Sequence, residues 1–266
     1  MRTWLTVDTD DLRHLPCYQG HPTRSSQPFE GDPIQMSDRF QTGWAGFHRW
    51  MGTHDHAVTL FVITDHFEDP AFQPLLSASL RAYEGRLTVG CHGHSHRSWS
   101  AWGEDLQGFG AMLDRSTRLL HHHAEKAVRP WFRAPAGYIA GWMADVLVDH
   151  GYTVDSSVNP SWVVRKKTNG EPWNNVTEAI ASAGMVERPW NTSLTLPVNG
   201  PALFRFPLSF IARRAWRRLP PPLKANEMDW IADGNHEVVT AYVHVLDFAR
   251  DDGSWTPPLR KTTASK

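Results

Sequence analysis

The chain has 266 residues, a formal net charge of −1 and a sequence pI near 7.0. Its 41% hydrophobic and 21% charged residues exclude a disordered protein and are typical of a globular one. The balanced charge excludes a global field that would hold nucleic acid, so we expect no nucleic-acid partner. Two cysteines exclude a disulfide framework.

The N-terminus and the apolar runs bear on localisation. The longest clean apolar run covers residues 58–63, far short of the ~18 residues of a membrane-spanning helix. An acidic residue, Asp8, occurs where a secretory signal peptide would still be apolar. The sequence therefore predicts a cytoplasmic protein without a transmembrane segment.

Short β-prone segments alternate with amphipathic ones along the chain. The former predict strands at 3–7, 57–63, 86–91, 128–132, 152–155, 185–188, 202–206 and 238–243. Apolar residues at helical spacing predict helices at 39–51, 70–83, 102–125, 139–150 and 210–219. This alternation indicates a parallel α/β architecture, and without repeats or a clear linker we expect a single domain over residues 1–266.

Two segments do not fit the alternation. Residues 12–38 are polar and rich in turn residues, and such a long excursion in a compact domain is often functional. It is predicted to be an insertion or a lid over the site, with an ordinary surface loop as the alternative. The C-terminal segment 252–266 is predicted to be a flexible tail.

Chemically active side chains follow the predicted strands at the end where each strand stops. In chain order they are Asp8, Asp10, His92, His96, Arg133, Asp155 and His244. Active sites of (β/α) barrels lie at the carboxyl ends of the strands. The pattern therefore predicts that these residues converge on one site.

Histidines and acids in this set point to a metal. His92 and His96 are four residues apart, and on a helical turn that spacing places both rings on one face, where they can chelate a cation. Asp8, Asp10 and Asp11 lie within four residues, and carboxylates so close need a cation or an arginine to compensate them. The alternatives are a merely polar histidine loop and an acidic turn cluster.

Two further residues have both structural and catalytic interpretations. Arg133 ends an apolar strand, and a buried arginine needs carboxylate partners, for which Asp8 and Asp155 are candidates. His244 lies between apolar neighbours at a strand end. It is either a hydrogen-bonded core histidine or a general acid.

In their order and context these residues resemble the polysaccharide deacetylase family, also called carbohydrate esterase family 4 or the NodB-homology domain. The motifs that carry the resemblance are Val7-Asp8-Thr9-Asp10, His92-x-x-x-His96, Arg133-x-Pro135, Asp155-Ser156-Ser157 and His244. It extends from about residue 3 to about residue 250. The resemblance implies a distorted (β/α) barrel of seven to eight strands, of the glycoside hydrolase/deacetylase type.

The resemblance also implies a metal centre. Asp10, His92 and His96 would bind one divalent ion, with zinc expected first and cobalt or nickel as alternatives. The neighbouring Asp11 leaves the identity of the carboxylate ligand open by one residue.

Roles in catalysis follow from the resemblance in the same way. Asp8 would be the general base and Arg133 would hold and tune it. Asp155 would orient His244, which would be the general acid. These assignments make the chain an enzyme, a metal-dependent hydrolase of non-peptide carbon–nitrogen bonds.

Substrate contacts are expected from the third motif and from a later tryptophan. Pro135, Ala136 and Gly137 would line the substrate pocket, with the Ala136 N–H binding the oxyanion, and Trp162 would contact the sugar. Ala136 stands where the family often has an aromatic residue, which changes one wall of the pocket.

The implied reaction is removal of an N-acetyl group from an amino sugar that is free, nucleotide-linked or lipid-linked, in bacterial surface polysaccharide biosynthesis. The alternatives are a deformylase or another amide hydrolase of the same superfamily, and an inert carbohydrate-binding relative. The basic segment 205–218 contains Arg205, Arg213, Arg214, Arg217 and Arg218. It is interpreted as a solvated helix face, as a surface for a phosphate-bearing substrate, or as a peripheral membrane contact.

Overall fold

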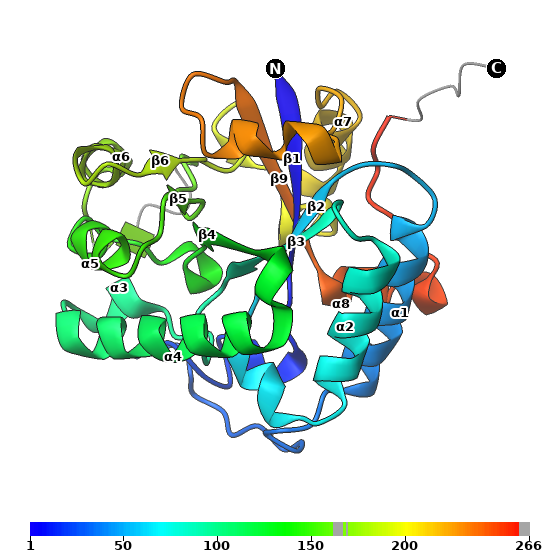
Figure 1. The fold of residues 1–266 in the computed structure, drawn as a ribbon, viewed down its shortest axis with the longest axis horizontal. Coiled ribbons are helices and arrows are strands. Elements are labelled where there is room, and N and C mark those ends of the chain that lie inside the picture. Colours follow the sequence, from blue (N-terminus) through cyan, green and yellow to red (C-terminus); the bar gives the residue numbers. More distant parts are fainter. Residues whose placement is uncertain (162–166, 169, 261–266) are drawn as a thin grey trace.

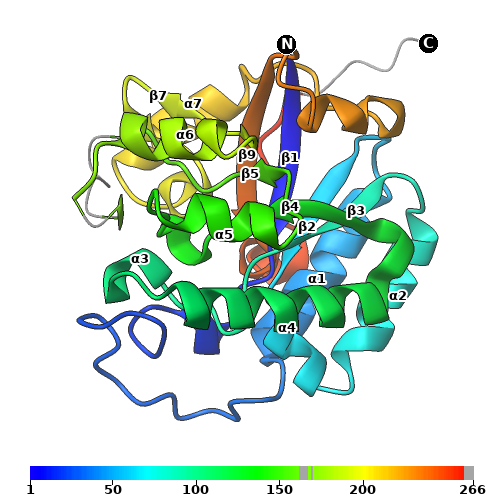
Figure 2. The same cartoon turned by 60° about the vertical axis from the view of Figure 1, so that its left-hand side comes forward.

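A curled parallel sheet forms the centre of the molecule (Figures 1 and 2). The computed structural model describes residues 1–161, 167–168 and 170–260. Over these residues the sheet has seven strands in the order β6-β5-β4-β3-β2-β1-β9. They are β1 (Arg2–Asp8), β2 (Val58–Val62), β3 (Leu87–Cys91), β4 (Val128–Phe132), β5 (Val154–Asp155), β6 (Val186–Glu187) and β9 (Val238–His244). This confirms the predicted distorted (β/α) barrel.

The segment that follows β6 spans the gap between the two edge strands of the sheet. Trp190 forms an isolated parallel bridge with Thr240 of β9, and the Thr240 hydroxyl donates to the Arg188 carbonyl oxygen at 3.1 Å. A short antiparallel hairpin, β7 (Thr192–Ser193) with β8 (Leu196–Pro197), comes next. The barrel is therefore closed by a few contacts at this point, which makes it distorted.

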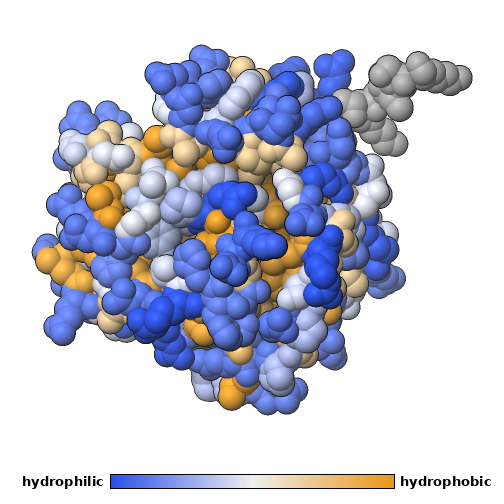
Figure 3. All heavy atoms as spheres, in the orientation of Figure 1, coloured by the Kyte–Doolittle hydropathy of each residue, from blue (hydrophilic) through white to orange (hydrophobic). Residues whose placement is uncertain are grey.

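Helices surround the sheet, with α1 and α2 on one side and α5 and α6 on the other (Figure 1). Their bounds are α1 (Asp38–Met51), α2 (Phe72–Ala82), α3 (Trp99–Trp102), α4 (Leu106–Ala124), α5 (Met143–Asp149), α6 (Trp173–Ser182), α7 (Leu208–Trp216) and α8 (Val245–Phe248). On the face seen in Figure 3, polar and apolar residues are interspersed. No helix in the described part of the chain is both long and apolar enough to span a bilayer.

The structure corrects two of the expected elements and adds a helix. The helix expected at 102–125 begins later, as α4 at Leu106, because Gly103 has a φ of 92° that an α-helix does not allow and ends the short α3 before it. The strand expected at 202–206 is instead a 3-10 helix at Gly200–Leu203 followed by turns. α6 falls in a stretch from which no element was expected.

Side-chain alternation along β1 separates the helix layer from the barrel interior. Leu5 and Val7 pack in the main core with the helices. Trp4 points inward, where its ring lies 5.7 Å from that of Phe61 and 5.3 Å from that of Trp131. Thr6 and Asp8 lie on the same side at successive alternate positions. Aromatic rings therefore fill part of the barrel interior, and the Asp8 carboxylate lies at the carboxyl end of β1.

The excursion at residues 12–38 packs against the carboxyl end of the barrel, below α3 and α4 in Figure 2. The carbonyl oxygen of Gly20 accepts hydrogen bonds from the Ser98 N–H at 2.7 Å and from the Trp102 indole at 3.2 Å. The excursion therefore lies beside the loop that follows β3. In the C-terminal segment, Trp255 packs 5.2 Å from Phe204, whereas residues 261–266 lie outside the described residues.

Candidate active site

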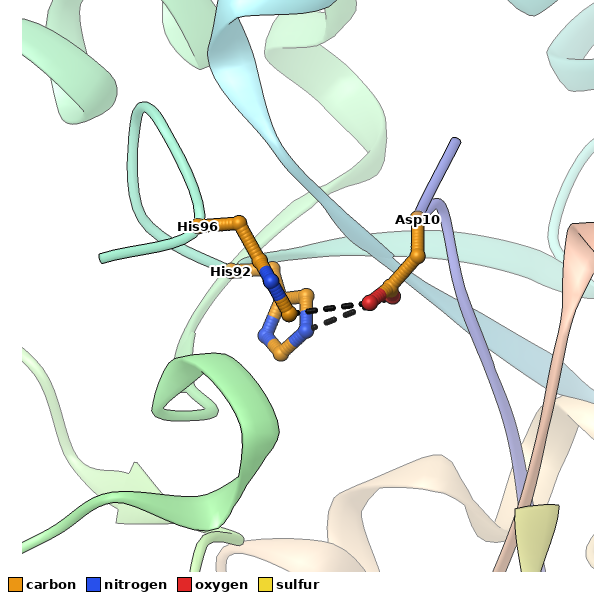
Figure 4. Close-up of side chains that lie close together, drawn as sticks. All are labelled: Asp10, His92 and His96. Atoms are coloured by element: carbon orange, nitrogen blue, oxygen red, sulfur yellow. Dashed lines mark ion pairs between the residues drawn. The ribbon is translucent and has the colours of Figure 1, made fainter. Parts of the chain in front are cut away.

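Three ligand-type side chains meet at the carboxyl ends of β1 and β3. His96 Nε2 lies 2.9 Å from Asp10 Oδ1, and His92 Nε2 lies 3.6 Å from Asp10 Oδ2. Figure 4 shows Asp10 pointing at both rings from the opposite side. The two histidines are buried. This is the geometry of a tridentate cation site that leaves positions open for other ligands.

Backbone carbonyls fix the orientation of both rings. Nδ1 of His92 donates to the Arg133 carbonyl oxygen, and Nδ1 of His96 donates to that of His14, each at 2.8 Å. Because a carbonyl only accepts, each neutral ring carries its proton on Nδ1 and directs the Nε2 lone pair at Asp10. Metal-binding histidines are held in this way.

Two atoms of this cluster lack hydrogen-bond partners. Among the described residues, Asp10 Oδ2 and His96 Nε2 are buried without one, and unpartnered buried polar atoms are costly. Although burial opposes the charged form, His96 and His92 hold the pKa of Asp10 well below its usual range. The donor set therefore fits a divalent cation, which would satisfy both atoms.

A loop, and not the expected helical turn, brings the two histidines together. Gly93 has a φ of 78° and His96 a φ of 51°, both in the left-handed region. A β-carbon at Gly93 would lie 3.3 Å from the ring of Pro135. The loop therefore turns back tightly over the third motif. The four-residue spacing brings the two histidines together through this tight turn and not through a helix.

Hydrogen bonds give Asp11 different surroundings from those of Asp10. The Asp11 carboxylate accepts from the backbone N–H groups of Leu12 at 2.6 Å and Ser37 at 2.9 Å. It also forms an ion pair with Arg13 at 3.3 Å. Asp11 thus anchors the excursion, and Asp10 is the carboxylate that faces the histidines.

Arg133 lies fully buried beneath Asp8. Its NH1 group donates to Asp8 Oδ1 at 2.6 Å and to the Thr6 hydroxyl at 2.7 Å. Its Nε donates to the Ser156 carbonyl oxygen at 3.0 Å, and its carbon Cζ lies 4.2 Å from the centre of the Phe61 ring. Of the two expected partners, Asp8 is the one in contact. A short charge-assisted bond fixes one carboxylate oxygen of Asp8 and compensates its charge.

His244 has a different carboxylate partner from the expected one. Its Nδ1 donates to Asp247 Oδ2 at 3.2 Å, and its backbone N–H donates to the same oxygen at 2.9 Å. Burial alone would lower the pKa of His244, but the hydrogen bond to Asp247 and the charges of Asp10 and Asp8 raise it to about 9. These interactions favour the imidazolium form of the ring.

The expected pairing of Asp155 with His244 is wrong. Asp155 accepts from the hydroxyl of Ser157 at 2.7 Å and from its N–H at 2.9 Å. The Ser157 hydroxyl oxygen in turn accepts from the Ala134 N–H at 2.7 Å. β5 and β9 are not neighbours in the sheet, whereas Asp247 lies one helical turn beyond His244. Asp155 therefore supports the third-motif loop.

A second carboxyl group lies beside Asp155. Burial raises the pKa of Asp155, and burial together with the Asp155 charge raises that of Glu187 well above its usual range. Two carboxyls so close in a dry environment share one proton. This pair lies below the loop and does not line the cavity.

The third-motif loop places Ala136 at the site. Pro135–Gly137 forms a 3-10 turn in which Ala136 has a φ of 52°. Gly137 has a φ of 70°, and a β-carbon there would lie 2.7 Å from the ring of Trp190. Ala136 lines the cavity described next, whereas the predicted sugar contact Trp162 lies outside the described residues.

A cavity of about 560 Å³ contains Asp10, His92 and His96, called the metal cluster from here on, together with Asp8 and His244. Its walls include two aromatic residues that the sequence analysis missed, Trp190 and Tyr242. Tyr242 lies two residues before His244 on β9, so the period-two rule could have found it. Trp190 carried no such signal, because its position depends on its bridge to Thr240.

The fold and the site together define a (β/α)-barrel protein with an Asp–His–His centre flanked by a buried arginine–aspartate pair and a histidine. The sequence model of the polysaccharide deacetylases matches residues 38–154, a range that includes His92, His96 and Arg133. This match and the fold confirm the predicted resemblance to the polysaccharide deacetylase family.

Three solved structures are similar to the chain. A Mycobacterium smegmatis protein assigned to the polysaccharide deacetylases superposes with a TM-score of 0.58 at 14% identity, covering 97% of this chain and 86% of that one. A Streptococcus mutans CE4 esterase gives 0.42 at 12% identity, covering 98% and 86%. A mutant of BA3943, a CE4 family pseudoenzyme, gives 0.40 at 11%, covering 97% and 68%. No curated protein matches the chain.

Proposed function

We propose that the chain is a metal-dependent hydrolase that removes the N-acetyl group of an amino sugar. The observation that carries this proposal is the composition of one cavity. Asp8, which is paired with the buried Arg133, and His244, which is paired with Asp247, line the same cavity as a three-ligand cation site. Hydrolysis of an amide needs these three functions, namely a base, an acid and a Lewis acid.

Asp10, His92 and His96 would hold the ion, and nitrogen and oxygen ligands of this kind suit zinc, cobalt or nickel. When bound, the ion supplies Lewis-acid polarisation of the acetyl carbonyl and of a water molecule. The hydrogen bonds from His92 and His96 to backbone carbonyls keep their Nε2 atoms directed at the site before any ligand arrives.

Asp8 is suited to accept the proton of the attacking water. Arg133 binds its Oδ1 at 2.6 Å, so Oδ2 remains for the water. The pairing holds the carboxylate in one orientation, and its position at the end of β1 places it in the cavity wall. A positioned base of this kind contributes about 100- to 10,000-fold to the rate.

His244 is suited to protonate the departing amine. Asp247 holds Nδ1, so Nε2 is the atom that donates the proton into the cavity. The N–H of Ala136, on the other wall, is our candidate for binding the developing oxyanion. The products are acetate and a free amino sugar. A role in bacterial surface polysaccharide biosynthesis rests on the family resemblance alone.

The test combines metal content with product identity. We expect about one divalent ion per chain in the purified protein, lost in the His92→Ala/His96→Ala variant, and acetate release from N-acetylated sugars. The matched control is Asp8→Asn, which should keep the ion but lose about 100- to 10,000-fold in rate. Release of formate would favour a deformylase. If no ion binds even after reconstitution, the chain is an inert relative.

A further inference from the structure

The rim of the cavity is cationic although the chain as a whole has a net charge of −1. Five basic side chains line it, and each comes from a different segment: Arg24, Arg39, Lys167, Arg205 and Arg250. Among the described residues, the only acid in the lining beyond the catalytic Asp8 and the ligand Asp10 is Asp247. That acid is already bound to His244. The positive charge of the rim is therefore largely uncompensated.

Most of these cations lack an acidic partner. Within the described residues, no ion pair involves Arg24, Arg39 or Arg205, and the guanidinium of Arg250 approaches Asp247 only to 4.0 Å. Surface arginines of a globular protein commonly face solvent, but here three of them face one cavity. Like charges gathered around a cavity repel one another, and a bound anion removes that cost.

In the described part of the chain, the charge of Lys167 is likewise not balanced by an acid, and this side chain is half-buried, whereas the three arginines without an ion pair are exposed. Its ammonium donates to the Ala136 carbonyl oxygen and lies 5.6 Å from the centre of the Trp190 ring. Burial, and to a lesser extent the charge of Arg24, lowers the pKa of Lys167 to about 8. An anion between Lys167 and Arg24 would raise the pKa of this amine again. The ammonium also lies one peptide away from the proposed oxyanion donor.

Arg250 is held in place without an ion pair of good geometry. Its guanidinium carbon lies 3.8 Å above the ring of Phe204, and Phe204 packs against Trp255. Stacking uses the flat face of the guanidinium and leaves its N–H groups, which point outward in the guanidinium plane, available to bind an anion. The side chain is therefore preorganised to bind an anion at the mouth of the cavity.

We infer that the rim binds a phosphate group attached to the amino sugar, so that the substrate is a sugar phosphate and not a neutral glycan. This inference deepens the proposed function and rests on it. A phosphate monoester carries nearly two charges and offers three acceptor oxygens, which matches several arginines from different segments. Trp190 and Tyr242 line the same cavity and suit the faces of a sugar ring.

The structure revises which basic residues serve this purpose. Of the cationic segment 205–218, only Arg205 lines the cavity, while Arg213, on α7, donates to the Leu203 carbonyl oxygen. Next to Arg205, the rings of Phe206 and Phe210 are 82% and 70% exposed. The phosphate therefore has two sources to be distinguished, a soluble sugar phosphate and a lipid-borne sugar phosphate whose tail would contact these rings.

Calorimetric binding to the catalytically impaired Asp8→Asn protein tests the inference separately from the reaction. The soluble probes are N-acetylglucosamine, N-acetylglucosamine 1-phosphate and UDP-N-acetylglucosamine. The lipid-borne probe is a polyprenyl diphosphate N-acetylglucosamine in detergent micelles. We expect at least one phosphorylated probe to bind at least about 10-fold more tightly than the neutral sugar, since hydrogen bonds between charged groups are that strong.

The Arg39→Ala/Arg205→Ala variant should reduce this preference to near unity. The matched control is Arg214→Ala/Arg217→Ala, which removes two exposed arginines outside the cavity and should keep the preference. A preference confined to the micellar probe and weakened by Phe206→Ala/Phe210→Ala would identify the lipid-borne source.

The possible results separate the two proposals. Equal or undetectable binding of all probes overturns the inference, as does a preference that survives in Arg39→Ala/Arg205→Ala. In either case, acetate release from neutral sugars by the unmodified enzyme would still support the deacetylase proposal. Tight binding of a phosphorylated probe without any acetate release by the unmodified enzyme would instead support the phosphate site and count against the reaction.

Discussion

Two groups, each of one aspartate and two histidines, lie at the carboxyl end of the barrel. The first is the metal cluster of Asp10, His92 and His96, and the second, called the salt-bridge cluster, is Asp65, His14 and His66. They touch, because the His14 carbonyl oxygen accepts the Nδ1 proton of His96. Residue types alone do not distinguish them.

Hydrogen bonds at the second ring nitrogen do distinguish them. In the salt-bridge cluster, the Asp11 N–H donates to His14 Nδ1 at 2.9 Å, so the ring proton is on Nε2 and is donated to Asp65 at 3.0 Å. The cation is already present, since Arg13 NH2 lies 3.1 Å from Asp65 Oδ1 and 3.1 Å from His66 Nδ1. The ring nitrogens of His14 and His66 that carry lone pairs already accept hydrogen bonds. In the metal cluster, the Nε2 lone pairs of His92 and His96 both point towards Asp10.

The largest effect is expected from the metal cluster. Asp10→Ala removes the carboxylate that faces both histidines, and we expect loss of the bound ion and of activity, measured by elemental analysis and acetate release. Asp65→Ala is the matched change in the salt-bridge cluster and should leave the metal stoichiometry unchanged. Equal metal loss in both variants would contradict the conclusion that, of the two clusters, only the metal cluster can bind an ion.

Asp65→Asn should instead reduce stability. The change leaves the buried His14 without its carboxylate and Arg13 with Asp11 alone, and breaking a buried ion pair costs about 3 kcal/mol. Urea unfolding at pH 7.5 measures this. An unchanged free energy of unfolding would contradict the assignment of a structural role to this cluster.

Acid should weaken the fold through His66. Burial, followed by the charge of His14, lowers the pKa of His66 to about 3 in the folded state, against 6.5 when unfolded. Asp65 acts in the opposite sense and Arg13 in the same sense as His14. Because the unfolded chain binds the proton first, this contribution is complete above pH 6.5 and is lost as the pH falls towards 3.

One such group changes the free energy of unfolding by at most about 1.4 kcal/mol per pH unit. Urea unfolding between pH 7.5 and 4.5 should show this slope, and it should be shallower in His66→Gln. A slope that is identical in the variant would assign the acid sensitivity to other groups.

The smallest effect is expected from Ser157→Ala. The substitution removes the acceptor of the Ala134 N–H and a donor to Asp155, at a cost of about 1 kcal/mol. Because the third-motif loop carries Ala136, we expect kcat to fall while metal content stays constant. A fall in metal content would place Asp155 and Ser157 in support of the metal cluster instead.

Much of the fold was predictable because it depends on local patterns. The alternation of strand and helix signals gave the parallel barrel, and the polar residues that end the strands gave Asp8, Asp10, His92, His96, Arg133 and His244, which the structure brings together. Their catalytic and metal-binding roles remain predictions that the experiments above test.

Other features depend on contacts between distant segments. The partner of His244 is Asp247 and not Asp155, because the strands that carry the expected pair are not adjacent. The wall residue Trp190 and the cationic rim could not be read from spacing, since the five basic residues lie in separate segments from Arg24 to Arg250.

The sequence by itself therefore determined the strand ends and the chemical character of the residues placed there, since both follow from hydrophobic periodicity and from the carboxyl-end rule for parallel strands. Only the tertiary structure decided which of two similar Asp–His–His groups has free lone pairs. That choice depends on which backbone group, the N–H of Asp11 or the carbonyl of His14, meets the second nitrogen of each ring. Such contacts form only when the excursion packs against the barrel.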